Sequence, residues 1–230
     1  KFKKKKKYIL LFTGGPTLNK FKKSDLSNEV WENCYVIAIK NSINFLDNKD
    51  IKVDFIATNF VGSVKRINQK LLEKHNTINI GLNFGKFPNL RNKMHYITNI
   101  DLSKNHMQSV KDDKKNIEFE NRNNKLYTGA GHTVMELGIP LSIFLEPQNI
   151  ITIGWDVENS TTHWDKKEGF INWHNETEII NKFSILFHDY LKKHYNINIY
   201  KINKNSGIKL PVFVEKNAYI DIFSTTFFNY

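Results

Sequence analysis

The sequence has one cysteine, Cys34, which excludes an internal disulfide bond and is typical of a reducing compartment such as the cytoplasm. No apolar run approaches the roughly 20 residues that a membrane-spanning helix needs. Only about five apolar residues follow the basic run near the start, so no signal peptide is expected. The cysteine spacing of a zinc site and the aromatic signature of an RNA-binding domain are both missing. Because Cys34 adjoins a predicted strand, we interpret it as a core residue rather than a nucleophile.

The composition favours one substantial core. The 230 residues are 40% hydrophobic and 13% aromatic, and no linker-like segment or internal repeat divides them, so we predict a single domain over residues 1–230. The net charge is +11, and Lys3–Lys7 form a basic block. Such a block is most often a solvated terminus, and it also suits contact with the anionic inner face of a membrane. The sequence argues against nucleic acid as the main partner and leaves the oligomeric state open.

Apolar segments of strand length alternate with segments of helical periodicity. This alternation predicts an α/β fold, a Rossmann-like, doubly wound and mostly parallel sheet. A helix over 128–144 is expected to be kinked or divided at Pro140. The predicted strands are 8–12, 35–39, 53–57, 78–82, 96–97, 150–154 and 197–202, and the other predicted helices are 24–32, 43–46, 63–74 and 176–195.

The most informative segment is the glycine turn that follows the first predicted strand, Tyr8–Phe12. Gly14 and Gly15 are suited to positive φ and to close approach of a ligand, while Pro16 fixes the turn and Thr17 is suited to capping the next helix. A glycine turn at the carboxyl end of the first parallel strand is where nucleotide-binding α/β folds hold phosphate or ribose. An ordinary strand-to-helix turn has the same composition.

Polar residues recur at the predicted carboxyl ends of other strands. Asn41, Asn59 and Asp156 each follow an apolar strand, and open parallel sheets bind ligands in the crevice outside these ends. The segment Thr128-Gly129-Ala130 opens a predicted helix whose backbone would face a phosphate. Asparagine and aspartate are also common turn residues, so the pattern rests on their repetition rather than on any one of them.

Six segments, taken in order, resemble small bacterial sialyltransferases, glycosyltransferase family 42, and related CMP-nonulosonate transferases. Thr13-Gly-Gly-Pro-Thr-Leu18 resembles the family's Gly-x-Gly-Pro-Ser-Leu signature, and Trp173-His174-Asn-Glu-Thr-Glu178 resembles the segment that carries its general base. The intermediate segments are Val36–Asn41, Phe55–Asn59, Thr128–Ala130 and Ile150–Asp156. Flagellin nonulosonate transferases share the first half, so the subgroup stays open.

The resemblance implies transfer of a sialic-acid-like sugar from a CMP donor to a glycan hydroxyl, without a metal or other cofactor. By position, His174 would be the general base. A lid over about 157–173 would present His163 and Trp164 to the departing phosphate, and 203–230 would be a C-terminal tail. The family's arginine before the Thr-Ser segment falls at Leu126, which leaves the donor sugar open. The implied nucleotide-binding residues are Gly14, Gly15, Pro16, Thr17, Asn41, Asn59, Thr128, Gly129, Ala130, Asp156 and Trp164.

Two alternatives remain. Asp156 and Glu158 follow an apolar strand, and two such carboxylates would suit Mn²⁺ or Mg²⁺ bound to the diphosphate of a nucleotide sugar. A basic binding protein without catalysis, docking through Lys3–Lys7, is the other. That second alternative leaves the strand-end residues unexplained.

Overall fold

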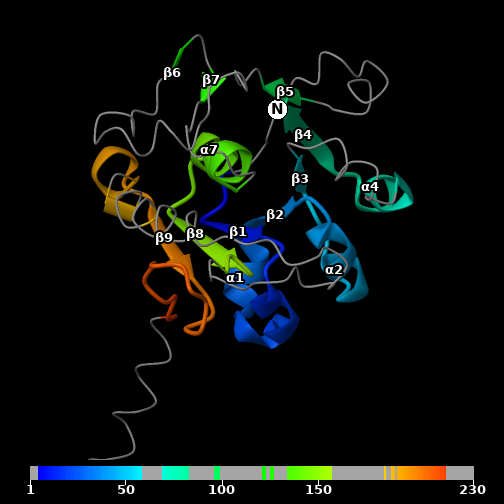
Figure 1. Cartoon of the computed structure of the whole chain (residues 1–230), viewed down its shortest axis with the longest axis horizontal. Coiled ribbons are helices and arrows are strands. Elements are labelled where there is room, and N and C mark those ends of the chain that lie inside the picture. The colour runs from blue at the N-terminus through cyan, green and yellow to red at the C-terminus, as the bar shows by residue number, and fades with distance from the viewer. Residues whose placement is uncertain are drawn as a thin grey trace, which may run out of the picture.

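The core of the fold is a parallel sheet of seven strands in the order β5-β4-β3-β2-β1-β8-β9 (Figure 1). The computed structural model describes residues 5–58, 69–82, 96–98, 121–122, 125–126, 134–156, 184, 188–189 and 191–215. Five strands run outward from β1 on one side, and β8 and β9 lie on its other side. The strands of the sheet are β1 (Tyr8–Phe12), β2 (Cys34–Ile39), β3 (Phe55–Thr58), β4 (Ile78–Leu82), β5 (Tyr96–Thr98), β8 (Asn149–Ile153) and β9 (Asn198–Lys201), while β6 (Asn121–Arg122) and β7 (Lys125–Leu126) form a separate antiparallel pair.

Helices cover both faces of the sheet, as the doubly wound prediction requires. Figure 1 shows α7 (Ile139–Phe144) on one side and α1 (Asn28–Glu32) and α2 (Ser42–Asn48) on the other. The fold class predicted from the sequence is therefore confirmed. The remaining helical elements are η1 (Pro16–Lys20), η2 (Lys23–Asp25), α4 (Gln69–His75) and η3 (Val134–Gly138).

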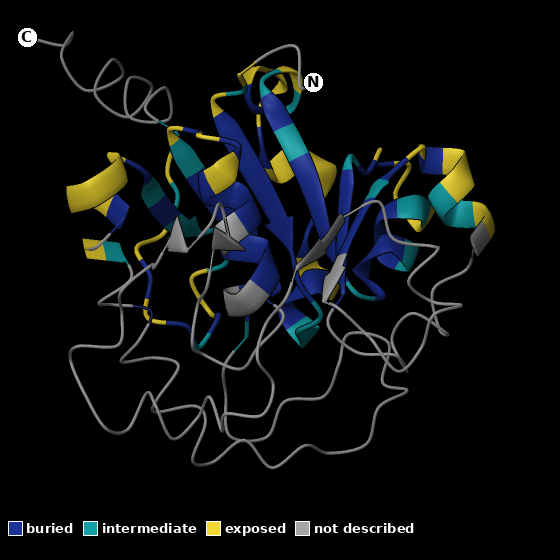
Figure 2. Ribbon diagram, turned by 90° about the horizontal axis from the view of Figure 1, so that it is seen from above, coloured by how far each residue is buried: buried dark blue, intermediate teal, exposed yellow. Residues whose placement is uncertain are grey.

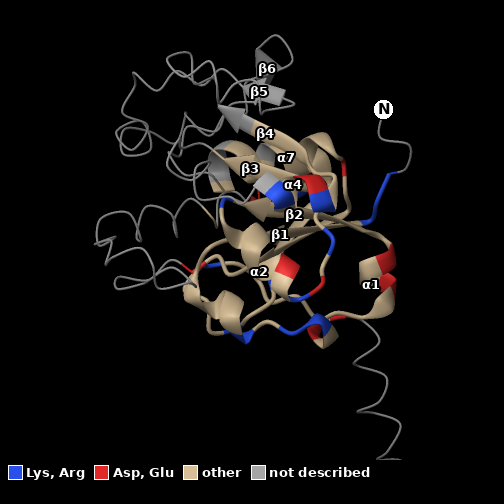
Figure 3. Ribbon diagram, turned by 90° about the vertical axis from the view of Figure 1, so that its right-hand side faces the viewer, with Lys and Arg blue, Asp and Glu red and all other residues tan. Residues whose placement is uncertain are grey.

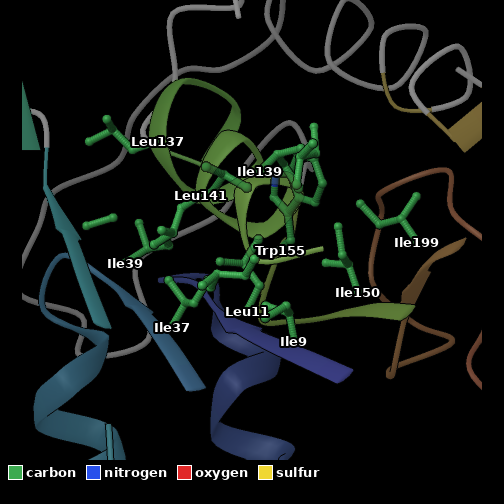
Figure 4. Close-up of a cluster of buried hydrophobic side chains, with 14 of the residues drawn as sticks. Ile9, Leu11, Ile37, Ile39, Leu137, Ile139, Leu141, Ile150, Trp155 and Ile199 are labelled. Atoms are coloured by element: carbon green, nitrogen blue, oxygen red, sulfur yellow. The ribbon is translucent and has the colours of Figure 1, made fainter. Parts of the chain in front are cut away.

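Strict alternation along the strands builds two apolar layers. On β1, Ile9 and Leu11 face the layer under α7, whereas Tyr8, Leu10 and Phe12 face the layer under α1 and α2. All five side chains are buried because β1 has a strand on either side and a helix layer on each face. Figure 4 shows α7 packed over β1, β2 and β8, and Figure 2 shows the buried strands behind helices with exposed outer faces.

The predicted helix over 128–144 is divided, as its proline indicates. A π-helical turn, η3, runs to Gly138, and α7 begins at Ile139 with Pro140 in its first turn. Gly138 lies close to the sheet, since a Cβ there would be 2.9 Å from Ile39 Cδ1 and 3.1 Å from Leu11 Cδ1. The predicted helix over 63–74 is described from Gln69, and helical residues within 184–195 fall in the predicted helix over 176–195.

The basic block lies at the amino edge of the sheet, opposite the carboxyl ends of the strands. Lys5 pairs with Glu146 at 3.0 Å and Lys7 with Glu29 at 2.8 Å, both at exposed positions (Figure 3). Hydrogen bonds to Glu29 and Tyr8 raise the pKa of Lys7 above its usual range. These lysines therefore bind the chain's own helices, and membrane contact through Lys3–Lys7 stays a prediction. Among the described helices, none has the length and apolarity to cross a bilayer.

Cys34 begins β2 and is buried, as the sequence indicated. Burial raises the pKa of its thiol to about 12, which leaves it protonated at neutral pH. At the other edge of the sheet, residues 203–215 fold back along β9. The Lys201 amide donates to the Pro211 carbonyl at 2.9 Å, and Phe213 packs edge-on against Tyr8 and Tyr200.

We predict that Leu11→Ala lowers the free energy of unfolding by about 2–5 kcal/mol, because Leu11 is fully buried in the central strand and its loss leaves a cavity. Phe144→Ala, at a side chain that is 62% exposed, should change it by less than about 0.5 kcal/mol. Chemical denaturation of both variants measures the difference. Equal losses would contradict the assigned core.

Candidate functional site

The candidate site is the carboxyl edge of the sheet between β1 and β8. Chain connections leave β1 toward β2 on one side, and β8 and β9 lie on the other, so the topology reverses at this point. Open α/β sheets bind their ligands in the crevice outside such a reversal. The glycine turn of residues 13–17 and the exit of β8, residues 154–156, both lie here.

Hydrogen bonds join these two loops beyond the end of the β1–β8 ladder. The Thr13 amide donates to the Ile153 carbonyl, and the Gly15 amide donates to the Gly154 carbonyl, both at 2.8 Å. Thr17 then donates twice to the Asp156 carboxylate, from its amide to Oδ2 and from its hydroxyl to Oδ1, each at 2.6 Å. We call the Thr17–Asp156 pair the carboxylate clamp. It fixes the glycine turn against the exit of β8.

The reason for glycine at position 15 is space rather than backbone conformation. Gly15 has φ of −76° and ψ of 162°, which any residue adopts, so the expectation of positive φ at Gly14 and Gly15 is wrong. A Cβ on Gly15 would lie 2.4 Å from the Gly154 carbonyl oxygen and 2.6 Å from Asp156 Oδ2. The positive φ belongs to Gly154, at 75°. Close contact between the two loops therefore excludes a side chain at position 15.

Thr17 was expected to cap a helix, and it instead binds Asp156, as described above. Gly15 is the residue that precedes η1, with Pro16 in the first turn. The cap of α1 is Ser27, whose hydroxyl accepts from the Val30 amide at 3.4 Å.

The β2 exit lies directly beside the glycine turn. Asn41 is buried there, and the hydroxyl of buried Ser42 donates to the carbonyl of Phe12, the last residue of β1, at 3.1 Å. The structure thus brings Asn41 to the same edge as Gly14–Thr17 and Asp156, as the sequence predicted. Ser42 was missed, although its position directly after Asn41 was the available signal.

On the far side of β8, Lys201 organises the loop that follows β9. Its ammonium donates to the carbonyls of Ser206 at 2.7 Å and Ile208 at 3.0 Å, and the Ser206 hydroxyl donates to the Trp155 carbonyl at 2.6 Å. Partial burial and nearby Lys209 lower the pKa of Lys201, while Asp156 opposes this shift. Sequence reasoning missed this loop, because nothing in its composition marks a binding segment.

The other predicted site residues lie outside the described residues, so their placement stays a prediction. They are Asn59, Thr128, Gly129, Ala130, Glu158, His163, Trp164 and His174. Within the described ranges, no group of three or more histidine, cysteine, aspartate or glutamate side chains is arranged to hold a metal ion. Both Asp156 oxygens already accept hydrogen bonds from Thr17, so the carboxylate acts first as a structural acceptor.

Sequence comparison places the chain in a family. Residues 1–162 match the family model described as 6-hydroxymethylpterin diphosphokinase MptE-like, and the chain belongs to this MptE-like family. The matched region contains β1 to β8, the glycine turn and Asp156. No curated protein sequence matches significantly.

The fold resembles that of bacterial sialyltransferases. The monofunctional alpha-2,3-sialyltransferase Cst-I from Campylobacter jejuni matches with a TM-score of 0.56 and 17% identity, over 91% of this chain and 81% of that one. CstII from Campylobacter jejuni, solved with a substrate analogue, cytidine-5'-monophosphate, has a TM-score of 0.49 and 15% identity, over 94% of this chain and 97% of that one. The predicted likeness to sialyltransferases is confirmed for the fold, and membership of glycosyltransferase family 42 stays a prediction.

We predict that Thr17→Val and Asp156→Ala each destabilise the fold in the presence of EDTA, and that their effects are coupled by about 1–3 kcal/mol in a double-mutant cycle. The reason is that each substitution removes a bond of the carboxylate clamp. Urea denaturation of the four proteins gives the coupling energy. Additive effects would show that the two side chains do not depend on each other.

Proposed function

We propose that this protein is a glycosyltransferase that moves a nonulosonic sugar from a CMP donor to a glycan hydroxyl. The observation that carries the proposal is the clamped glycine turn at the sheet's topological reversal, with Asn41 beside it. The fold-level likeness to a sialyltransferase supports it. The choice of CMP rests on the order of the strand-end segments, from Gly14 to Asn59, in the sequence resemblance.

The proposed reaction needs a proton acceptor and a way to stabilise the leaving group. His174 would accept the proton of the acceptor hydroxyl while that oxygen attacks the anomeric carbon of the sugar and the bond to the CMP phosphate breaks. Histidine suits this role because its unperturbed pKa lies near neutrality. The lid of residues 157–173, with His163 and Trp164, would cover the departing phosphate. Asn41, Asn59 and Thr128–Ala130 would hold the nucleotide.

A second candidate is metal-assisted transfer of a diphosphate or a diphosphate-linked sugar. The family description, a 6-hydroxymethylpterin diphosphokinase, favours a nucleoside triphosphate as the donor for this candidate. Asp156 and Glu158 would supply the metal ligands. The two Thr17 bonds to Asp156 weaken this candidate, because a primary metal ligand usually directs its carboxylate at the ion.

We expect CMP to raise the melting temperature more than UDP, GDP or ATP does, with no change on adding EDTA. A ligand at about 100 times its Kd stabilises by ~2.7 kcal/mol, which a thermal-shift screen detects easily. Stabilisation by ATP only in the presence of Mg²⁺ would favour the second candidate. Activity lost in EDTA and restored by Mn²⁺ would favour Asp156 and Glu158 as metal ligands.

We expect His174→Ala to lower kcat by about 10²–10⁴-fold while changing CMP affinity little, since a positioned base contributes about this much and the nucleotide contacts lie elsewhere. His163→Ala is the comparison variant and should weaken donor affinity or phosphate departure. Steady-state kinetics and CMP titration separate the two effects. If His174→Ala keeps near-normal turnover and His163→Ala loses it, the base is misassigned.

A further inference from the structure

Lys40 has an unusual backbone for its position. Five non-glycine residues in the described ranges have positive φ, and four of them, Asp50, Asn76, Glu146 and Asn196, follow the end of a helix. A left-handed residue is a common way to end a helix, and hydrogen bonds such as Ile51 N–H to the Leu46 carbonyl accompany it. Lys40, with φ of 54°, follows a strand instead.

The strand register places this residue beside the glycine turn. Phe12 of β1 pairs with Ala38 of β2, so Lys40 and Gly14, each two residues further on, leave the sheet at the same level. The Lys40 amide donates to the Ala57 carbonyl of β3 at 2.9 Å. Lys40 therefore lies at the carboxyl edge, with β1 on one side and β3 on the other.

Glycine would adopt this conformation at lower cost than lysine, because it has no Cβ to clash in the left-handed region. Strained backbone of this kind concentrates at ligand-binding sites, where the surrounding structure holds it in place. Here the holding contacts are the Lys40 amide bond to Ala57 and the bond from the Ser42 hydroxyl to Phe12. The half-buried lysine is thus kept at the edge of the crevice by its neighbours.

Charge at this edge gives the lysine a specific use. The Asp156 carboxylate lies on the other side of the glycine turn and would repel a phosphate bound there. Lys201 already donates to two carbonyls of its own loop. A lysine on the β2 side would offset the charge of Asp156 and attract an anionic ligand, since a charge-assisted bond to phosphate is about twice as strong as a neutral one.

We propose that Lys40 recognises the phosphate group of the nucleotide bound at the carboxyl edge, and that its left-handed backbone places it there. The inference rests on the proposed function for the choice of nucleotide, and its chemistry, a lysine ammonium binding a phosphate, is the same for CMP and for ATP. A purely structural role for Lys40, in which only the turn matters, makes the opposite prediction for glycine at this position.

The experiment compares Lys40→Gly, Lys40→Asn and Lys40→Arg with Glu146→Gly, which changes a left-handed residue at the end of α7. Lys40→Gly and Glu146→Gly should both keep or raise the melting temperature. We expect Lys40→Gly and Lys40→Asn to lower CMP affinity ~10-fold while leaving cytidine affinity unchanged, since cytidine lacks the phosphate. Lys40→Arg should retain most of the CMP affinity, and Glu146→Gly all of it.

Titrations of CMP, ATP and the matching nucleosides into each variant separate the outcomes. If the wild-type protein binds ATP rather than CMP, and Lys40→Gly loses the preference for ATP over adenosine, the phosphate role of Lys40 holds and the CMP donor is wrong. CMP affinity unchanged in Lys40→Gly, or equal losses for CMP and cytidine, would overturn the phosphate role. Absence of nucleotide binding to the wild-type protein would overturn both proposals.

Discussion

The double hydrogen bond from Thr17 to the Asp156 carboxylate is the constraint on which the carboxyl edge of this protein depends. Parallel strands end at the same edge, but their ladder stops there and the loops are otherwise free to diverge. The clamp extends the β1–β8 contact past the last ladder bond. It also explains why position 15 is glycine, because the loops approach too closely for a Cβ. Both loops meet at the point where the sheet topology reverses.

From the clamp, a continuous series of contacts runs across the edge. Ser42 binds the last carbonyl of β1, Ser206 binds the carbonyl of Trp155, and Lys201 holds the loop that contains Ser206. These groups link the exits of β2, β1, β8 and β9. Backbone carbonyls that no longer have ladder partners are thereby satisfied by side chains, which lowers the cost of burying them. A rigid edge of this kind suits a site that must position a ligand with small tolerance.

Apolar alternation was enough to predict the strands, because β1, β2 and β8 are buried on both faces and read as continuous apolar runs. Pro140 likewise marked the division of its helix. The sequence could also place Gly14, Asn41 and Asp156 at one edge, since parallel strands end together. It could not predict the Thr17–Asp156 pair, because that bond joins residues 139 positions apart and no local pattern encodes it. Gly15 was misread for a related reason, since local sequence reports backbone freedom and not the space left by a distant loop.

The clamp also limits what Asp156 can do chemically. A carboxylate that accepts two bonds from Thr17 has its orientation fixed by the protein and not by a ligand. Its negative charge nevertheless remains at the edge, so an anionic donor bound there needs positive charge from elsewhere. Metal ions and lysines are the two sources that proteins use, and they differ in reach and in dependence on chelators. With the acidic group committed to structure and Lys40 held beside the glycine turn by its left-handed backbone, side-chain cations are the source that this edge is built to supply.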